Sequence, residues 1–353
     1  MNIEGKTIWA VACGENHSGS GRDFSKVCTD WDVILMGSGK KGPYFEKKAS
    51  YDELKNRVDY KMFAEDIEDG HIIVLHRGMS EILGVGMVVG EYKWSKLFED
   101  IDGWDLQHYR RVRWLPLKGV DTYFKSKAIG RGGAVHKIHS VEVIERLKSL
   151  SVTDTDMKRE LKELPKTEPK PVTYDEIGKY LCEKGVSSTQ VETLLKEFDK
   201  LIKLADWYDK NGQPSEHETV AYLVIPILRA LGWTHEQMAV EWEHVDLALF
   251  DQPTRKDENL AVVVEVKKKG HACLSAQSQA EHYAQSKDHC KRLIVTDGLR
   301  YGTFLRERDE NNTWIWKRSA YFNLRQLTDK YSIYECGGAK EALHIMAKEF
   351  LYE

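Results

Sequence analysis

The sequence of 353 residues predicts a multidomain protein of the α+β or α/β class, with two or three domains. Three observations support this. Residues 1–145 alternate short apolar runs with glycine-rich turns, which is typical of a mostly β domain with short helices. Residues 150–172 are rich in charge and contain three prolines, which is typical of a linker. From residue 211 onward, helical and strand-like patterns alternate, which predicts a mixed sheet flanked by helices.

Bulk composition excludes several classes of protein. The formal net charge is −4, so any surface for nucleic acid must be a local basic patch. The six cysteines form no CxxC pair, which favours reduced thiols over a disulfide framework or a zinc site. No apolar run approaches 18 residues and the N-terminus lacks a signal-peptide pattern, so we expect a cytoplasmic protein with no membrane contact.

The first domain shows its elements in order along the chain. We expect strands at 6–13, 30–39, 71–78, 81–94 and 109–117, a helix at 51–67, and a closing strand or loop that leads into a helix over 135–150. Within 81–94, Gly84, Gly86 and Gly90 predict bulges or close backbone contacts. The Gly/Ser stretch 14–21 lacks the GK[ST] ending of a phosphate loop, so no nucleotide cofactor is expected.

Two helices are expected after the linker, at 173–185 and 187–212. The second carries apolar residues at helical spacing, including Leu194, Phe198 and Leu201. This apolar stripe can pack on the domain that follows or on a second protomer.

Two carboxylates and one lysine stand out in the last domain. Asp246 lies in the apolar run 245–250 and Glu265 lies in the run 260–266, with polar residues 252–259 between them. If the two runs form a hairpin, both carboxylates can lie side by side, and Lys267 points to the same face as Glu265. Carboxylates bind Mg²⁺, and a lysine can hold a water or neutralise phosphoryl charge. The alternative is that both acids only cap strand ends beside a solvated lysine run.

The flanking segments have equally regular patterns. Residues 215–232 predict a helix that begins with the capping box Ser215–Glu218 and is kinked at Pro226. Gln279 and Tyr283 are four residues apart, so on a helix they share a face. A strand, an Asp-Gly turn and a strand follow at 292–305, then a strand at 313–324 and a helix at 339–350.

This order resembles the PD-(D/E)xK nuclease superfamily, in particular the nuclease region of type I restriction enzyme R subunits, over residues 213–310. The matching parts are Glu218, Asp246, Glu265-x-Lys267, Gln279-x-x-x-Tyr283 and the VTDG strand and turn. The resemblance implies that Asp246 and Glu265 bind Mg²⁺, with Mn²⁺ as a substitute, and that Lys267 positions or activates water. Glu218 would assist at the metal, while Gln279 and Tyr283 would support the site or contact the nucleic-acid backbone. One departure is Val245, where the family often has proline.

The first domain resembles the PUA-like superfamily, particularly EVE-type domains, over about residues 5–140. The features are Trp9, the loop into Trp31, the Gly70–Leu75 strand, the small-residue strand 81–94 and the RRVRW strand. The resemblance implies a small β-barrel that reads a flipped, modified base. The candidate base-pocket residues are Trp31, Asp32, Trp94, Tyr44 and His76, and the candidate phosphate contacts are Arg77, Arg110 and Arg113. The alternative is that the aromatics fill a core and the arginines line a solvated strand face.

Together these resemblances predict a prokaryotic, type IV-like restriction endonuclease for phage defence, which cuts double-stranded DNA that carries modified cytosine. The expected parts are the reader (1–149), a charged linker with a helical segment (150–210) and the nuclease (211–353). Cutting both strands needs two active sites, so a homodimer is expected. The alternatives are a nuclease for modified RNA and a non-catalytic nucleic-acid-binding regulator. The intact set of Asp246, Glu265 and Lys267 weighs against the second.

Overall fold

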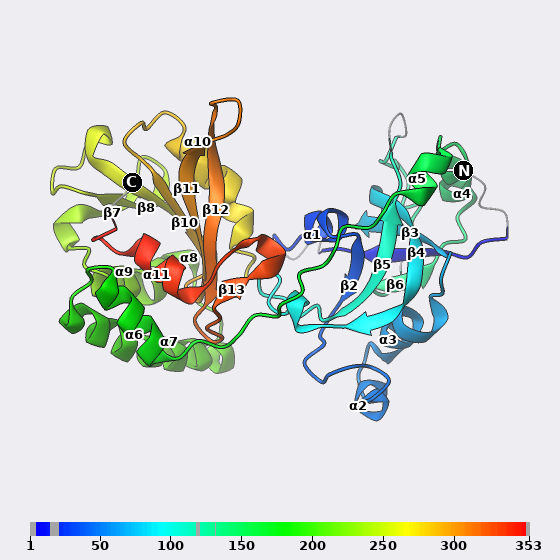
Figure 1. The fold of residues 1–353 in the computed structure, drawn as a ribbon, viewed down its shortest axis with the longest axis horizontal. Helices are drawn as coiled ribbons and strands as arrows, with labels where there is room; N and C mark the ends of the chain where they lie inside the picture. Colours follow the sequence, from blue (N-terminus) through cyan, green and yellow to red (C-terminus); the bar gives the residue numbers. More distant parts are fainter. Residues whose placement is uncertain (1–4, 15–20, 118–120, 131, 351–353) are drawn as a thin grey trace. The chain divides into compact units, whose positions relative to one another are not determined.

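A computed structural model describes residues 5–14, 21–117, 121–130 and 132–350 (Figure 1). The chain divides into two compact units, Met1–Lys166 and Thr167–Glu353. Each unit has its own multi-stranded mixed sheet with helices around it, which confirms the predicted mixture of α and β structure.

The first unit is built on a six-stranded sheet in the order β2-β5-β4-β3-β1-β6. Its strands are β1 (Ile8–Ala12), β2 (Val33–Met36), β3 (Ile72–Arg77), β4 (Glu81–Trp94), β5 (His108–Trp114) and β6 (Val135–Lys137). Strands β1 and β3 run parallel, and the other neighbours run antiparallel. Its helices are α1 (Ser25–Asp30), α2 (Lys48–Asp52), α3 (Arg57–Lys61) with a π-helical turn (Met62–Asp66), α4 (Val141–Lys148) and α5 (Asp154–Lys158).

The predicted barrel is not closed among the described residues. Strands β2 and β6 are the two edges of the sheet, and neither pairs with the other. Strand β2 has four residues and β6 has three, so each edge offers few backbone groups for a closing ladder. The opening that remains is lined by β1, β2 and β6, and it holds the cavity described below.

The glycines of β4 have the predicted role. A Cβ atom on Gly86 would lie 2.4 Å from Cγ1 of Val112 and 2.8 Å from the Trp114 ring, so only glycine fits beside that indole. The ladder between β4 and β5 shifts register between Val89 and Lys93, and Gly90 lies there with φ of 76°. Both the close approach and the bulge predicted from the sequence are confirmed.

The second unit is built on an eight-stranded sheet in the order β13-β14-β12-β11-β10-β9-β8-β7. Its strands are β7 (Met238–Trp242), β8 (Val245–Phe250), β9 (Leu260–Val266), β10 (Arg292–Thr296), β11 (Arg300–Arg308), β12 (Trp314–Asn323), β13 (Lys330–Tyr331) and β14 (Cys336–Gly337). Its helices are α6 (Tyr174–Glu183), α7 (Ser188–Asn211), α8 (Glu216–Thr219), α9 (Ile225–Ala230), α10 (Gln277–Ala284) and α11 (Ala339–Met346). None of the helices in the described ranges is long and apolar enough to cross a lipid bilayer.

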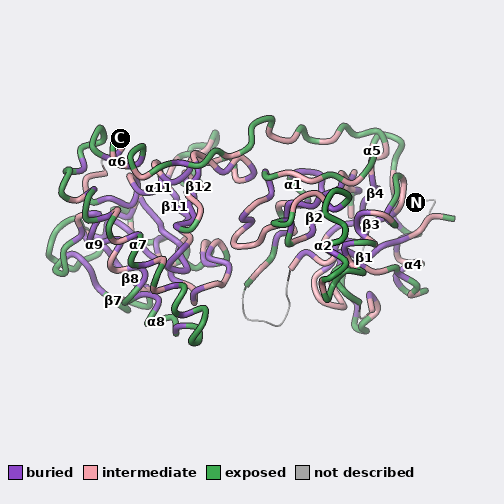
Figure 2. The backbone as a smooth tube through the Cα atoms, turned by 90° about the horizontal axis from the view of Figure 1, so that it is seen from below, coloured by how far each residue is buried: buried purple, intermediate pink, exposed green. Residues whose placement is uncertain are grey.

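Helices cover both faces of this sheet. Side chains from α6, α7, α9 and α11 form one core with β8, β9 and β10, and α10 forms a second core on the opposite face. Strands β9 and β10 run parallel, and the chain between them passes through α10. The strands are therefore buried along most of their length, as Figure 2 shows in purple.

The helix over 215–232 is interrupted where Pro226 predicts a kink. Helix α8 passes into a π-helical turn, Val220–Val224, and α9 restarts with Pro226 in its first turn. Proline has no backbone N–H and its ring collides with the carbonyl four residues earlier, so the wider turn relieves that contact.

The predicted segment 150–210 is shared between the two units. Its end, with α6 and α7, belongs to the second unit, where Ile177, Leu194 and Phe198 are fully buried in the core. The stretch between α5 and α6 has no helix or strand and is mostly exposed or half-buried, as expected for a linker (Figure 2). The apolar stripe of α7 therefore packs on its own unit.

Candidate active site and base pocket

The two predicted acidic residues lie opposite each other on neighbouring strands. Strands β8 and β9 pair antiparallel with Leu247 facing Val264, so the next residues along the two strands are Asp246 and Glu265. Asp246 Oδ2 accepts a 2.7 Å hydrogen bond from the backbone N–H of Val266, which holds its carboxylate against β9. The hairpin thus brings together two carboxylates that are 19 residues apart in sequence.

Glu265 is in an environment that disfavours its charge. The residue is fully buried, and neither of its carboxyl oxygens makes a hydrogen bond of ordinary geometry, although Asp246 lies close enough to interact with them. Burial and the neighbouring Asp246 carboxylate raise the pKa of Glu265 from 4.5 to about 8, although Lys267 acts in the opposite direction. A buried carboxyl without a partner costs stability unless something else fills its coordination.

Lys267 is connected to helix α10. Its Nζ donates a 2.9 Å hydrogen bond to Oε1 of Gln279, and Nε2 of Gln279 donates a 3.4 Å hydrogen bond to the Tyr283 hydroxyl. Gln279 and Tyr283 are one helical turn apart, so both face the lysine. The hydrogen bonds from Lys267 to Gln279 and from Gln279 to Tyr283 therefore hold the ammonium group beside the acidic pair.

The acidic pair fits a hard divalent cation. Mg²⁺ binds through one or two protein carboxylates and retains several waters, so it needs no large protein cage. The described residues contain no group of three or more His, Cys, Asp or Glu placed to hold a metal, so the acidic pair alone would provide the protein ligands. Asp246 and Glu265 would supply carboxylate oxygens to such an ion.

The structure places Glu218 in a capping box with Ser215 at the start of α8, and its predicted role at the metal stays a prediction. Its carboxylate accepts a 2.7 Å hydrogen bond from the Ser215 backbone N–H, and Ser215 Oγ accepts one from the Glu218 N–H. This capping box lowers the pKa of Glu218, with a smaller contribution from Lys268. None of its hydrogen bonds reaches Asp246 or Glu265, so we assign it to the start of α8.

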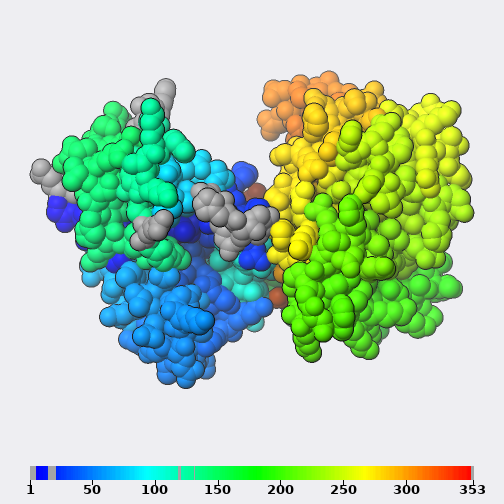
Figure 3. Space-filling view, turned by 180° about the vertical axis from the view of Figure 1, so that it is seen from behind, coloured from blue at the N-terminus to red at the C-terminus, as the bar shows by residue number. Residues whose placement is uncertain are grey.

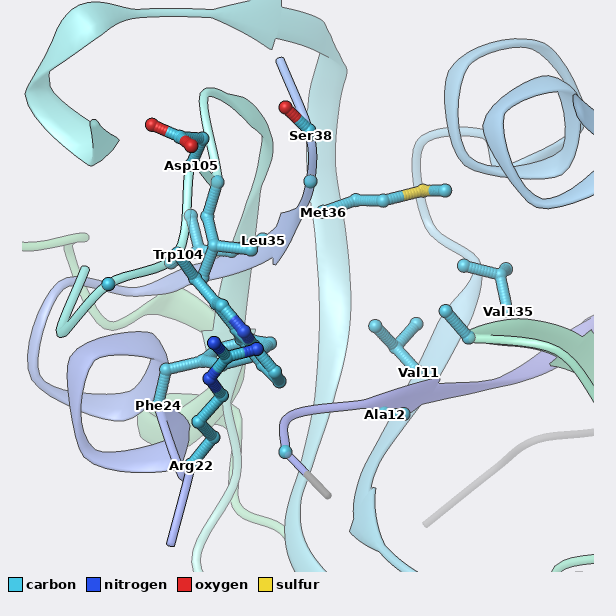
Figure 4. Close-up of a pocket in the computed structure, with 15 residues that line it drawn as sticks. Val11, Ala12, Arg22, Phe24, Leu35, Met36, Ser38, Trp104, Asp105 and Val135 are labelled. Atoms are coloured by element: carbon cyan, nitrogen blue, oxygen red, sulfur yellow. The ribbon is translucent and has the colours of Figure 1, made fainter. Parts of the chain in front are cut away.

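A candidate binding cavity of the first unit lies in the opening of its sheet. It has a volume of about 480 Å³, within the range of small-molecule sites. Figure 4 shows Met36 from β2 facing Val11 and Val135 across the cavity, with Trp104 and Arg22 along another wall. The residues that give the cavity its chemistry are Arg22, Phe24, Met36, Ser38, Trp104 and Asp105.

Aromatic and charged groups are stacked along that wall. The Arg22 guanidinium lies 5.0 Å from the Trp104 ring centroid, and Phe24 meets the same indole edge-to-face at 5.2 Å. Asp105 forms a 3.0 Å ion pair with Lys40. The cavity thus has a planar apolar wall, a cation and a carboxylate, which together suit a flat heterocycle with polar edges.

None of the five predicted base-pocket residues lines this cavity. Tyr44 is buried, and its hydroxyl lies 3.2 Å from Glu65. Trp94 donates a 3.0 Å hydrogen bond to the Gly39 carbonyl. His76 is a buried residue of β3, its Nδ1 lies 2.6 Å from the Gly78 carbonyl, and burial lowers its pKa to about 4. These three side chains hold the fold around the cavity.

Trp31 and Asp32 attach the chain after α5 to the sheet. Arg159 donates two hydrogen bonds to the Asp32 carboxylate, at 2.5 and 3.0 Å, and the Lys162 backbone N–H donates a third at 2.8 Å. The Lys162 ammonium lies 3.6 Å from the centroid of the buried Trp31 ring. Both oxygens of Asp32 are therefore occupied by the chain itself.

Replacing Asp32 with alanine is expected to lower the free energy of unfolding by about 1–3 kcal/mol, because Arg159 and a backbone amide lose their acceptor. The lower part of this range applies, since the Arg159 side chain is 43% exposed. Urea denaturation measures the change, with Asp30→Ala as control, because Asp30 pairs only with exposed Lys26. Unaltered stability of Asp32→Ala would contradict the anchoring role.

The predicted phosphate contacts are also engaged within the protein. Arg110 is buried, and its guanidinium donates to the carbonyls of Phe63 and Ala64 at 2.7 and 2.8 Å, so it is not available to a phosphate. Arg77 pairs with Asp23 and Glu81. Arg113 donates a 2.8 Å hydrogen bond to the Arg159 carbonyl.

The cavity residues come from loops that carry no periodic pattern. Trp104 and Asp105 lie in the turn before β5, and Arg22 and Phe24 follow the Gly/Ser stretch, of which residues 15–20 lie outside the described part of the chain. The sequence signal that could have identified this wall is the turn Asp102-Gly103 followed directly by Trp104.

One family model matches part of the chain. The model described as "Domain of unknown function (DUF8426)" matches residues 9–128, which include most of β1, all of β2 to β5 and most of the cavity wall. No curated protein and no solved structure matches the chain.

Proposed function

We propose that the protein is a metal-dependent endonuclease that acts on DNA carrying a modified base. The observation that carries the proposal is the buried, unpartnered carboxyl of Glu265 opposite Asp246, with Lys267 held beside it by Gln279. A fully buried carboxyl without a partner is rare in a purely structural role. Perturbed pKa values of this kind are typical of functional sites.

In this proposal Asp246 and Glu265 hold Mg²⁺, or Mn²⁺ in its place. The ion would supply Lewis-acid polarisation of the phosphate and a lower pKa for water. Lys267 neutralises the negative charge that develops on the phosphoryl oxygens as water adds to phosphorus and an ester oxygen departs. Gln279 orients the ammonium group, and Tyr283 orients Gln279 in turn. A homodimer would provide one such site for each strand.

The first unit would read the base. The 480 Å³ cavity is large enough for a nucleobase turned out of the helix, and Trp104 and Phe24 offer an apolar wall for it. Ser38 and Asp105 offer hydrogen-bonding groups to its polar edge. This assignment replaces the five residues chosen from the sequence, and it accords with a PUA-like reader whose sheet remains open.

The test is a cleavage assay on three matched duplexes that carry cytosine, 5-methylcytosine or 5-hydroxymethylcytosine, each with Mg²⁺ and with EDTA. We expect metal-dependent cutting of a modified duplex only. Replacing Trp104 with alanine should weaken binding of that duplex about tenfold or more, because the base loses its stacking partner. Tyr123→Ala is the control, since Tyr123 is 60% exposed and lies outside the cavity.

The outcomes separate the two halves of the proposal. Equal cutting of all three duplexes would support the nuclease activity and contradict the recognition of a modified base. Absence of cutting in every condition, with intact binding of DNA, would contradict the nuclease and favour the binding protein considered above.

A further inference from the structure

A second basic and aromatic surface lies on the β11–β12 hairpin of the second unit. The ladder pairs Arg306 with Trp316 and Arg308 with Trp314, and residues two apart on a strand share a face. Two arginines and two tryptophans therefore occupy one face of the hairpin. We call these four residues the hairpin patch.

The hairpin patch borders a groove against helix α10. The groove has a volume of about 370 Å³, and its lining residues are Ser278, Glu281, His282, Gln285, Arg306, Trp314 and Trp316. In Figure 1 the hairpin extends past α10, and in Figure 3 its orange tip projects beside the gold α10 segment. The α10 residues of the groove lie on the helix face next to that of Gln279 and Tyr283.

The charge of the surface favours an anion. Three cations lie over the Trp314 ring: the Arg308 guanidinium at 4.2 Å from its centroid, Lys291 Nζ at 4.7 Å and the Arg306 guanidinium at 5.3 Å. Two carboxylates are nearby, Glu281 in the lining and the fully exposed Asp288 at 3.9 Å from Arg306. The cations outnumber them.

The aromatic side chains favour bases over a bare phosphate. Trp314 is 40% exposed, although burial of an indole is normally favourable. Trp316 is half-buried and packs against the same core as Tyr283, so the patch and the acidic pair lie on one face of the sheet. Bases in a duplex are stacked on each other, whereas an unpaired base is free to stack on indole.

We propose that this groove binds an unpaired nucleotide of the strand that is cut, with its base on Trp314 and its phosphates on Arg308 and Lys291. This inference rests on the proposed nuclease activity, because it assigns the groove to the same substrate. It makes an unpaired stretch some nucleotides away from the scissile bond part of the preferred substrate, because the strand register puts Glu265 level with Val295 and Gly302, several residues along the sheet from Arg308.

The test measures binding of a fluorescent oligothymidylate to the full chain in EDTA, where no cutting occurs. Trp314→Ala should weaken binding about tenfold through lost stacking. Arg308→Gln should reduce the slope of log affinity against log salt by about 0.7, the value for one phosphate contact on a single strand. The matched controls are Trp207→Ala and Lys196→Gln, because both residues are exposed on α7, away from the groove, and Trp207 is 55% exposed.

Photocrosslinking locates the contact directly. An oligonucleotide with 5-iodouracil should form its adduct within residues 314–316. Adducts confined to the first unit, or unaltered affinity of Trp314→Ala, would overturn the proposal even if the protein cuts duplex DNA. Because the binding assay omits metal, a failure of cleavage leaves its result interpretable and bears on the proposed nuclease alone.

Discussion

Replacing Lys267 with alanine is expected to reduce Mg²⁺-dependent cleavage by about a hundredfold to a thousandfold, the usual effect of removing one group that stabilises transition-state charge. The ammonium group lies two residues beyond Glu265 and is held by Gln279 at 2.9 Å, so no other described lysine is placed in the same way. The measurement is the initial rate of cleavage at saturating metal.

Lys268→Ala is the matched control for this variant. Lys268 is the next residue and is equally half-buried, but it points to the other side of the chain, where it acts on Glu218. We expect its rate to stay within a few-fold of wild type. An equal loss in both variants would indicate that the lysine run only attracts the nucleic acid. Full activity of Lys267→Ala would contradict the proposed role of Lys267 in cleavage.

The second unit was predictable because its site rests on local rules. A hairpin brings Asp246 opposite Glu265, alternation along a strand puts Lys267 on the face of Glu265, and one helical turn separates Gln279 from Tyr283. Each of these relations depends on spacing along the chain. The unpartnered burial of Glu265 was not predictable, since it depends on how α10 and the sheet pack around it.

The cavity of the first unit was not predictable, because it depends on residues that are far apart in the sequence. Its walls come from β1, β2, β6 and two loops, and the curvature of the sheet brings them together. Asp32 was chosen as a hydrogen-bond acceptor by residue type, yet its partner Arg159 lies 127 residues away. Aromatic type alone also does not separate Trp31, which packs under Lys162, from Trp104, which lines the cavity.

Glu265→Gln is expected to remove a loss of stability that the metal-free wild type shows as the pH rises. The pKa of Glu265 is raised from 4.5 to about 8 in the folded state, so between these values the folded chain binds more protons than the unfolded chain. Stability therefore falls as pH rises from about 4.5 through 8. Glutamine resembles the protonated carboxyl, so the variant should exceed wild type at pH 9 by on the order of 3–5 kcal/mol and equal it near pH 5.

Denaturant unfolding of the full chain between pH 5 and pH 9, in EDTA, measures this difference. Glu258→Gln is the control, because Glu258 is exposed on the loop between the same two strands and pairs only with exposed Lys256. If the stability of wild type and of Glu265→Gln changed in the same way with pH, the raised pKa of Glu265 would be contradicted.

Added Mg²⁺ provides a second test of the Glu265 carboxyl, through its competition with the proton. A cation competes with the proton for Glu265, so the apparent affinity of Mg²⁺ for wild type should fall about tenfold for each pH unit below 8. Mg²⁺ should accordingly raise the unfolding temperature of wild type more at pH 8 than at pH 6, and it should have little effect on Glu265→Gln. Equal stabilisation of wild type and Glu265→Gln by Mg²⁺ would show that the ion binds elsewhere. Only an ion bound at the Glu265 carboxyl links metal affinity to the protonation of that group.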